Sequence, residues 1–128
     1  MKRQSFEDLV ETAIRDLPAE FADRIENVAF VVQDWPSPIH LARAGTRRRR
    51  DLLGLYEGVP LTERGSGYNM VVPDKITIFR KPIELHCASR REVEEDVRRV
   101  VYHEIAHYFG IDEERLRMLE SRRGPIPW

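Results

Sequence analysis

The feature that most constrains this chain is a His-Glu-x-x-His sequence, formed by His103, Glu104 and His107. Residues four apart lie on one face of an α-helix, so the two histidines can present their imidazole nitrogens to one point. Zinc accepts imidazole nitrogens at about 2.0–2.1 Å, and two helical histidines supply half of a tetrahedral ligand set without backbone strain. The stretch therefore predicts a helix that carries two metal ligands.

Glu104 lies about 100° around the helix from His103. It can reach a water held at the metal, but it is too far around the helix to be a ligand. Such a carboxylate suits a general base that activates the water, which is the arrangement of zinc metallopeptidases. The alternative is that His103 and His107 are core histidines bonded to the backbone. It is disfavoured because Glu104 would then be buried without a partner.

The sequence around the motif favours one helix over residues 89–109. Ser89 and Glu92 have the spacing of a capping box, and Gly110 suits the left-handed residue that ends a helix. Five residues fall on the arc that we expect to be buried: Val93, Val97, Val100, Val101 and Glu104. Two ion pairs are expected on the opposite arc: Glu94 with Arg98, and Glu95 with Arg99.

Composition limits the class of protein. A chain of 128 residues is expected to form a single domain over 1–128 that buries about two-thirds of its unfolded surface. The formal net charge of −1 gives no reason to expect nucleic acid or a membrane as a partner. One cysteine excludes an intramolecular disulfide, and no apolar stretch near Met1 has the length of a signal peptide. We therefore expect a cytoplasmic protein, with a monomer favoured.

Apolar periodicity predicts an α+β fold, with a three- or four-stranded mixed sheet packed on the motif helix and an N-terminal helix alongside. The expected helices cover 5–17 and 112–120, with one further turn allowed within 19–27. The expected strands cover 28–33, 52–57 and 75–80, the first of them covered on both faces. We expect irregular chain over 39–45, and residues 83–86 either extend the third strand or lead toward the motif helix.

Four further stretches invite interpretation. Residues 58–67 predict a mobile loop near the cleft. The arginines at 47–50 could hold an acidic partner or a phosphate backbone, although a solvated loop is favoured. His86 and Cys87 are adjacent, but no second cysteine lies nearby, so a structural zinc site there is improbable. The tail at 122–128 is expected to be loosely ordered.

Three stretches of the chain resemble the small bacterial zincin-like metallopeptidase family. They are LGLYEGVPLTER at 53–64, PDKITIFR at 73–80 followed by PIE at 82–84, and residues 100–116. The resemblance implies a small mixed sheet on the motif helix, with one strand bordering the cleft, and it implies peptidase activity. It also implies a motif of the form HExxHxxGxxD, in which the last acid is the third zinc ligand.

This chain departs from that form at the last position. The residue ten places after His103 is Glu113, and Asp112 comes one place early. The spacing favours Glu113. Asp112 competes as a ligand, but it also fits the N-cap of the last helix. Glu120, a water molecule or no third ligand remain alternatives. The expected zinc site therefore has His103, His107 and Glu113 as ligands.

Two functions follow from these residues. The first is a zinc-dependent hydrolase of peptide or protein substrates, in which Glu104 is the general base. The donor that stabilises the oxyanion is left open among His86, Tyr108 and Tyr56. The second is a catalytically weak metal-binding or regulatory module, which the shortness of the chain supports. Glu104 favours the enzyme, because metal binding alone does not need a carboxylate there.

Overall fold

The structure is a computed structural model that describes residues 1–65, 67 and 72–123, with the backbone alone at 119–123. A three-stranded mixed sheet lies at its centre, in the order β1-β3-β2. Strand β1 (Val28–Gln33) runs parallel to β3 (Asp74–Phe79), and β2 (Gly54–Glu57) runs antiparallel to it. The predicted α+β class is confirmed, with three strands in the sheet.

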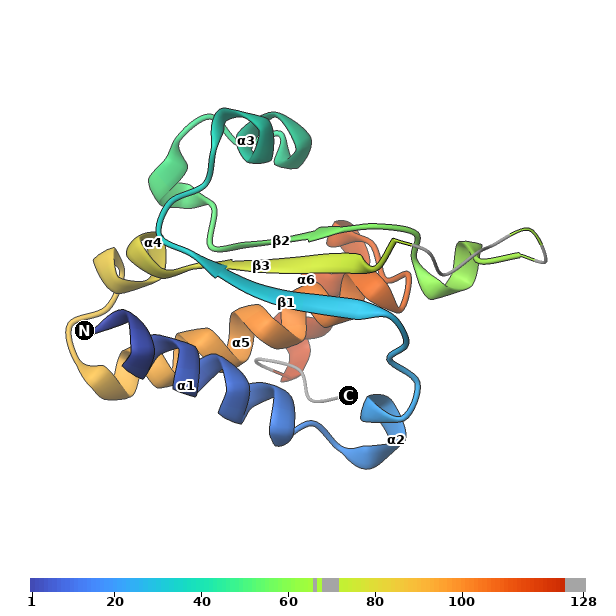
Figure 1. The fold of residues 1–128 in the computed structure, drawn as a ribbon, viewed down its shortest axis with the longest axis horizontal. Coiled ribbons are helices and arrows are strands. Elements are labelled where there is room, and N and C mark those ends of the chain that lie inside the picture. The colour runs from blue at the N-terminus through green and yellow to red at the C-terminus, as the bar shows by residue number, and fades with distance from the viewer. Residues whose placement is uncertain (66, 68–71, 124–128) are drawn as a thin grey trace.

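Two long helices cover one face of this sheet (Figure 1). They are α1 (Arg3–Arg15) and the motif helix α5 (Arg90–Tyr108), which pack against each other. The shorter helices are α2 (Ala19–Ala22), α3 (Pro38–Ala44), α4 (Arg80–Leu85) and α6 (Glu113–Arg123). Two 3-10 turns, η1 (Arg49–Asp51) and η2 (Leu61–Glu63), flank β2 in the sequence.

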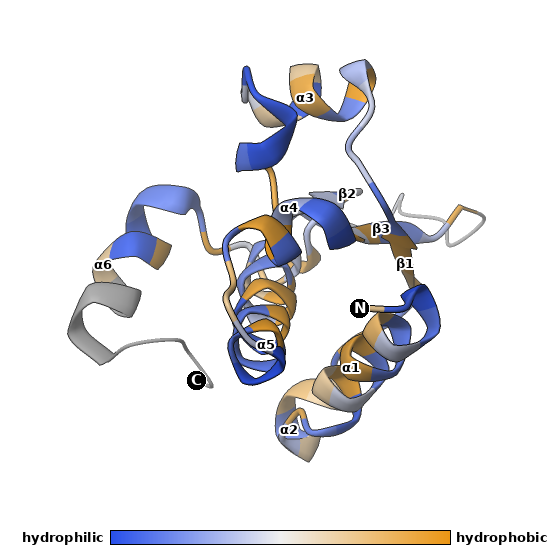
Figure 2. Cartoon of the chain, turned by 90° about the vertical axis from the view of Figure 1, so that its left-hand side faces the viewer, coloured by the Kyte–Doolittle hydropathy of each residue, from blue (hydrophilic) through white to orange (hydrophobic). Residues whose placement is uncertain are grey.

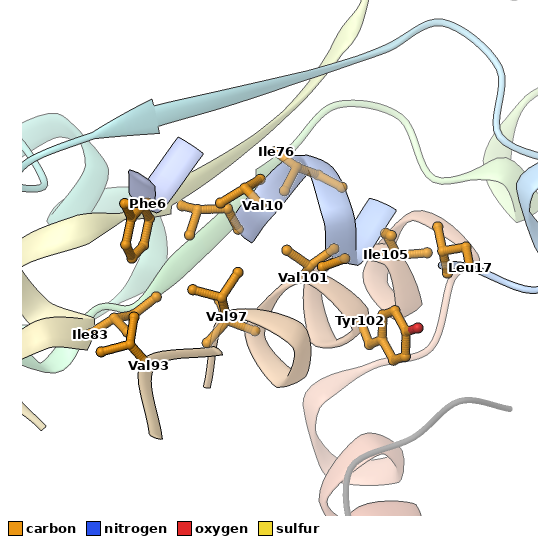
Figure 3. Close-up of a cluster of buried hydrophobic side chains, with 13 residues drawn as sticks. Phe6, Val10, Leu17, Ile76, Ile83, Val93, Val97, Val101, Tyr102 and Ile105 are labelled. Atoms are coloured by element: carbon orange, nitrogen blue, oxygen red, sulfur yellow. The ribbon is translucent and has the colours of Figure 1, made fainter. Parts of the chain in front are cut away.

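The hydrophobic core lies between the two long helices and the sheet (Figure 3). Val97, Val101 and Ile105 of α5 are fully buried there, together with Phe6 of α1 and Ile76 of β3. Burying one such side chain contributes about 1.5–3 kcal/mol, so this cluster fixes α5 against the sheet. The predicted buried arc of the motif helix is confirmed, including Glu104.

The ends of α5 follow their sequence signals, although the polar partners differ from those expected. Ser89 accepts a hydrogen bond from the backbone N–H of Glu92 at 3.2 Å, but the Glu92 carboxylate accepts from Ala88 rather than from Ser89. The ion pairs also differ: Arg90 pairs with Glu94, Arg91 with Glu95, Arg98 with Asp16 and Arg99 with Asp96. Arg98 turns away from Glu94 because Asp16 at the end of α1 lies 2.9 Å away.

Strand β1 is placed correctly by the sequence, but its predicted cover on both faces is wrong. Its first five residues are half-buried and Gln33 is exposed, whereas the central strand β3 is buried at five of six positions. The reason is topological, because β1 is an edge strand and pairs only with β3. The continuous apolar run gave no sign of this edge position.

Two helices replace the irregular or extended chain that we expected. Helix α3 begins at Ser37, which exchanges capping hydrogen bonds with His40, and ends at Gly45 in the left-handed conformation (φ 67°). Pro38 at its first position is favourable, so its start and stop signals were present in the sequence. Residues 80–85 form α4 instead of extending β3. Of the two alternatives for 83–86, the strand is therefore wrong, and the segment leads toward the motif helix.

The remaining predicted segments are matched in part. The first helix begins at Arg3, two residues before its predicted start, and β2 begins at Gly54 instead of residue 52. Within 58–67 the chain forms η2, residue 66 lies outside the described part, and the mobility of the loop stays a prediction. In the tail, residues 124–128 lie outside the described part. Among the described helices, none has both the length and the apolar character that crossing a membrane requires.

Candidate active site

Helix α5 presents His103 and His107 side by side, with their ring centroids 5.1 Å apart. Glu113, at the start of α6, reaches back to both of them. Its Oε1 atom lies 2.9 Å from His103 Nε2 and 2.8 Å from His107 Nε2. The structure thus brings together the three residues that we predicted as metal ligands.

The turn that returns Glu113 to the helix depends on Gly110. Gly110 has φ 87°, and Ile111 N–H donates to the carbonyl of Ala106 at 3.1 Å, as in a Schellman motif. A Cβ at this position would lie 2.3 Å from Thr62 Oγ1, which belongs to η2. The conformation and the close contact therefore both require glycine, and η2 is packed directly on the turn that places Glu113.

The hydrogen bonds of His107 indicate what this cluster can bind. Its Nδ1 lies 3.0 Å from the carbonyl oxygen of Ile111, which can only accept, so Nδ1 must carry the hydrogen. In neutral His107 the lone pair on Nε2 then points at Glu113 Oε1, which is itself an acceptor. Two such acceptors repel unless a proton or a cation lies between them.

A zinc ion fits this donor set. Two imidazole nitrogens and one carboxylate oxygen form a common catalytic zinc set, and the second hydrogen bond of His107 is typical of a ligating histidine. Two ligands of a tetrahedral zinc ion stand roughly 3.3 Å apart. Glu113 Oε1 lies 2.9 Å from His103 Nε2 and 2.8 Å from His107 Nε2, so these two distances are within a few tenths of an ångström of that spacing.

Glu104 lies under β2, and only 7% of its surface is exposed. It lies close to both histidines, because one ligand atom each from His103, Glu104 and His107 falls within 4.8 Å of the others. Burial raises the pKa of its carboxyl, while the nearby histidines and a hydrogen bond from the backbone of Tyr56 oppose the rise. A raised pKa makes the Glu104 carboxylate a stronger base.

Gly54 of β2 makes room for Glu104. A Cβ on this glycine would lie 2.7 Å from Val100 Cγ1 and 3.1 Å from Glu104 Cγ. The strand can therefore cross the helix at this distance only with no side chain at position 54. Apolar periodicity predicted a strand here, but it did not indicate that this glycine lies against the catalytic candidate.

The two neighbouring acids, Asp112 and Glu113, have different surroundings. Partial burial acts to raise the pKa of Glu113, but hydrogen bonds and charge from His103 and His107 outweigh it and lower the pKa. Asp112 Oδ1 instead accepts a hydrogen bond from Arg115 N–H at 2.8 Å, as an N-cap does. The structure thus places the Glu113 carboxylate against both histidines and Asp112 at the N-cap of α6, while the Glu120 side chain lies outside the described part.

A cleft of about 610 Å³ opens above these residues. One wall is β2 with residues 53–56, and the floor is α5 at His103, Glu104 and His107. Glu63 of η2 also lines the cleft. Within the described part of the chain, strand β2 is the other edge of the sheet, since it pairs there with β3 alone. The edge of β2 therefore borders the cleft, as the resemblance implied.

The side chains left open as oxyanion donors are engaged elsewhere. The Tyr56 hydroxyl donates to Asp74, and burial together with this carboxylate raises the pKa of Tyr56. The Tyr108 hydroxyl accepts from Glu26 N–H at 2.9 Å. His86 Nδ1 lies 3.2 Å from the Pro82 carbonyl oxygen and is not among the residues that line the cleft.

The adjacent pair His86 and Cys87 does not form a metal site in the described part of the chain. The Cys87 thiol donates to Asp96 at 3.5 Å, and burial, followed by the charge of Asp96, raises the pKa of Cys87 to about 11. Within the same part of the chain, the metal-binding side chains that converge are those of His103, Glu104 and His107, with Glu113 against the two histidines.

A buried ion pair that the sequence did not reveal supports one side of the cleft. Arg64 donates to Asp74 Oδ2 at 2.6 Å and to the carbonyl of Val59 at 2.9 Å, and its guanidinium lies 4.9 Å from the centre of the Tyr108 ring. Both charged side chains of this pair are nearly inaccessible. The pair fixes residues 59–64 to β3 and to the end of α5, next to His107. Arg64 lies in a stretch without periodicity, so no pattern could have indicated its burial.

Comparison with known proteins agrees with this geometry. The sequence model of the zincin-like metallopeptidase family matches residues 25–123, which contain all three strands, the motif helix and Glu113. A search of curated proteins found no match. The family implies a metal, typically zinc. Because the match covers most of the chain, the protein belongs to the zincin-like metallopeptidase family.

Proposed function

We propose that the protein is a zinc-dependent peptide hydrolase. His103, His107 and Glu113 hold the zinc ion, and Glu104 is the general base. The observation that carries this proposal is the convergence of two imidazole nitrogens and one carboxylate oxygen at the floor of a cleft, beside a buried carboxylate. Zinc bound there would polarise the scissile carbonyl and bring the pKa of a coordinated water toward about 7.

Glu104 moves the proton in this mechanism. Its carboxylate takes a proton from the attacking water and later delivers it to the leaving amine. Burial raises the pKa of Glu104, which improves it as a base and then as an acid. The Tyr56 N–H and the narrow gap under Gly54 hold the carboxylate in place during both transfers.

The substrate that fits this cleft is an extended peptide. Strand β2 has a neighbour on one side only, and residues 53–56 line the cleft. A peptide can add to such an edge through main-chain hydrogen bonds, which do not depend on its sequence. Its scissile bond would then pass over Glu104 and the three ligands.

The test compares wild type with Glu104→Gln, both loaded with zinc, on a broad peptide library. Glu104→Gln keeps its size but loses the base, so zinc should remain while turnover falls by at least about 10²-fold to 10⁴-fold. Glu94→Gln, on the exposed side of the same helix, is the matched control and should keep its activity. Loss of zinc from Glu104→Gln would contradict the assigned roles. Stoichiometric zinc without any cleavage by wild type would instead indicate a metal-binding module.

A further inference from the structure

An arginine patch lies beside the cleft and takes no part in the chemistry described above. It consists of Arg47, Arg48, Arg49 and Arg50, which are all exposed. They occupy the turn between α3 and β2, and the last two belong to η1. Figure 2 shows α3 and the hydrophilic stretch beside it standing away from the two long helices.

The patch differs from the arginines of the two long helices in its lack of acidic partners. Those of α1 and α5 are each paired with a carboxylate: Arg3, Arg15, Arg90, Arg91, Arg98 and Arg99. None of the four patch arginines makes an ion pair within the part of the chain that the structure describes. Four adjacent like charges repel one another, and an acidic partner would relieve this repulsion.

The structure holds the patch at the rim of the cleft. Arg49 stacks over the ring of Trp35, 4.2 Å from its centre, and η1 packs on α4. Thr46 and Asp51, which flank the patch in the sequence, both line the cleft. A peptide that leaves the cleft past these two residues would therefore meet the arginines directly.

Apart from Arg99, which is paired with Asp96, the charged side chains elsewhere in the cleft are acidic. Glu63 and Asp112 line it and are exposed, and neither makes an ion pair within the described residues. A peptide with acidic residues would be repelled there and attracted at the patch. Repulsion by the acidic side chains and attraction by the arginine patch therefore favour one placement of an acidic segment along the cleft.

We propose that the arginine patch is a docking surface for an acidic segment of the substrate polypeptide. The inference rests on the proposed function, because it treats the cleft as the place where a peptide is cleaved. An acidic polypeptide fits better than nucleic acid. The patch spans only four residues of a chain with a net charge of −1, and it adjoins a strand edge suited to a peptide.

The binding test uses two labelled peptides with the same apolar segment, one followed by four glutamates and the other by four glutamines. Binding is measured by fluorescence anisotropy in a zinc-loaded Glu104→Gln background, so that turnover does not interfere. The variant Arg47→Gln/Arg48→Gln/Arg50→Gln should bind the glutamate peptide about tenfold more weakly, as three exposed ion pairs predict. Raising the salt to about 0.5 M should remove this difference.

The matched control variant removes the same number of positive charges at positions away from the cleft. Arg15→Gln/Arg90→Gln/Arg91→Gln removes three exposed arginines that do not line it. This variant should bind both peptides as the unmodified background does, within about twofold. Equal binding of the two peptides, or equal loss in both triple variants, would overturn the proposal. Patch-dependent binding of an RNA oligomer that exceeds binding of the glutamate peptide would overturn it in favour of nucleic acid.

Hydrolysis measured in parallel on chains that keep Glu104 separates this inference from the proposed function. If peptides are cleaved at rates that depend neither on their acidity nor on the arginine patch, the hydrolase function is supported and the docking surface is refuted. If binding depends on the patch but nothing is cleaved, the acidic docking surface stands and the hydrolase fails. If both hold, the acidic segment should lower KM and leave kcat nearly unchanged, because the patch lies outside the reacting groups.

Discussion

Removing Arg64 should destabilise the protein far more than removing an arginine from its surface. In the ion pair with Asp74, the exposed fraction of the side chain is 6% for Arg64 and 4% for Asp74. Arg64→Met keeps most of the side-chain volume but leaves the Asp74 carboxylate buried, with Tyr56 and Val59 as its remaining donors among the described residues. Breaking a buried pair in this way costs about 3–5 kcal/mol.

That loss corresponds to a fall in Tm of about 10–20 °C for a chain of this length. The assay is thermal and urea unfolding of the metal-free chain at pH 7, with Asp74→Asn and the double variant completing a cycle. The double variant should recover part of the stability, because neither charge is then left alone. Arg91→Met is the control: its pair with Glu95 is exposed, so it should cost less than about 0.5 kcal/mol. A loss below about 1 kcal/mol for Arg64→Met would refute the reasoning.

Three further predictions concern other parts of the chain. Gly54→Ala should destabilise by about 1–3 kcal/mol and lower turnover, because the new Cβ meets Val100 and Glu104. Thermal unfolding and peptide assays check this, and Val100→Ala should restore part of the stability. Cys87, with a pKa of about 11, should react with iodoacetamide at pH 8 about 10²-fold more slowly than a free cysteine. Mass spectrometry measures the rate, and a rate like that of a small thiol would be contrary evidence. Asp112→Ala should cost about 1 kcal/mol from the lost cap and leave the zinc affinity nearly unchanged, whereas a large drop in a zinc titration would make Asp112 a ligand.

The parts of the fold that local signals control were predictable. Helix α5 has a cap at Ser89, a buried arc and a terminating Gly110, and all three signals agree in the structure. Helix α3 had equally clear signals in Ser37, Pro38 and Gly45. It was missed because a segment with two prolines was interpreted as irregular.

The features that long-range packing controls were not predictable. The edge position of β1 depends on the number of strands in the sheet, which no single apolar run reveals. The ion partners of α5 depend on where α1 ends, since Asp16 draws Arg98 away from Glu94. The spacing of the motif predicted that Glu113 lies near the histidines. The close approach of Gly54 to Glu104, by contrast, could be recognised only in the folded structure.

The account depends most on zinc binding by His103, His107 and Glu113. The direct measurement is the zinc content and zinc affinity of the purified chain, by mass spectrometry and by titration at pH 7. We predict one zinc per chain in wild type, and a loss of affinity by orders of magnitude in His103→Ala and His107→Ala. Glu113→Ala should weaken binding more than Asp112→Ala does. A wild-type chain that binds no zinc, or one whose affinity is unchanged when His103 or His107 is replaced, would contradict the account.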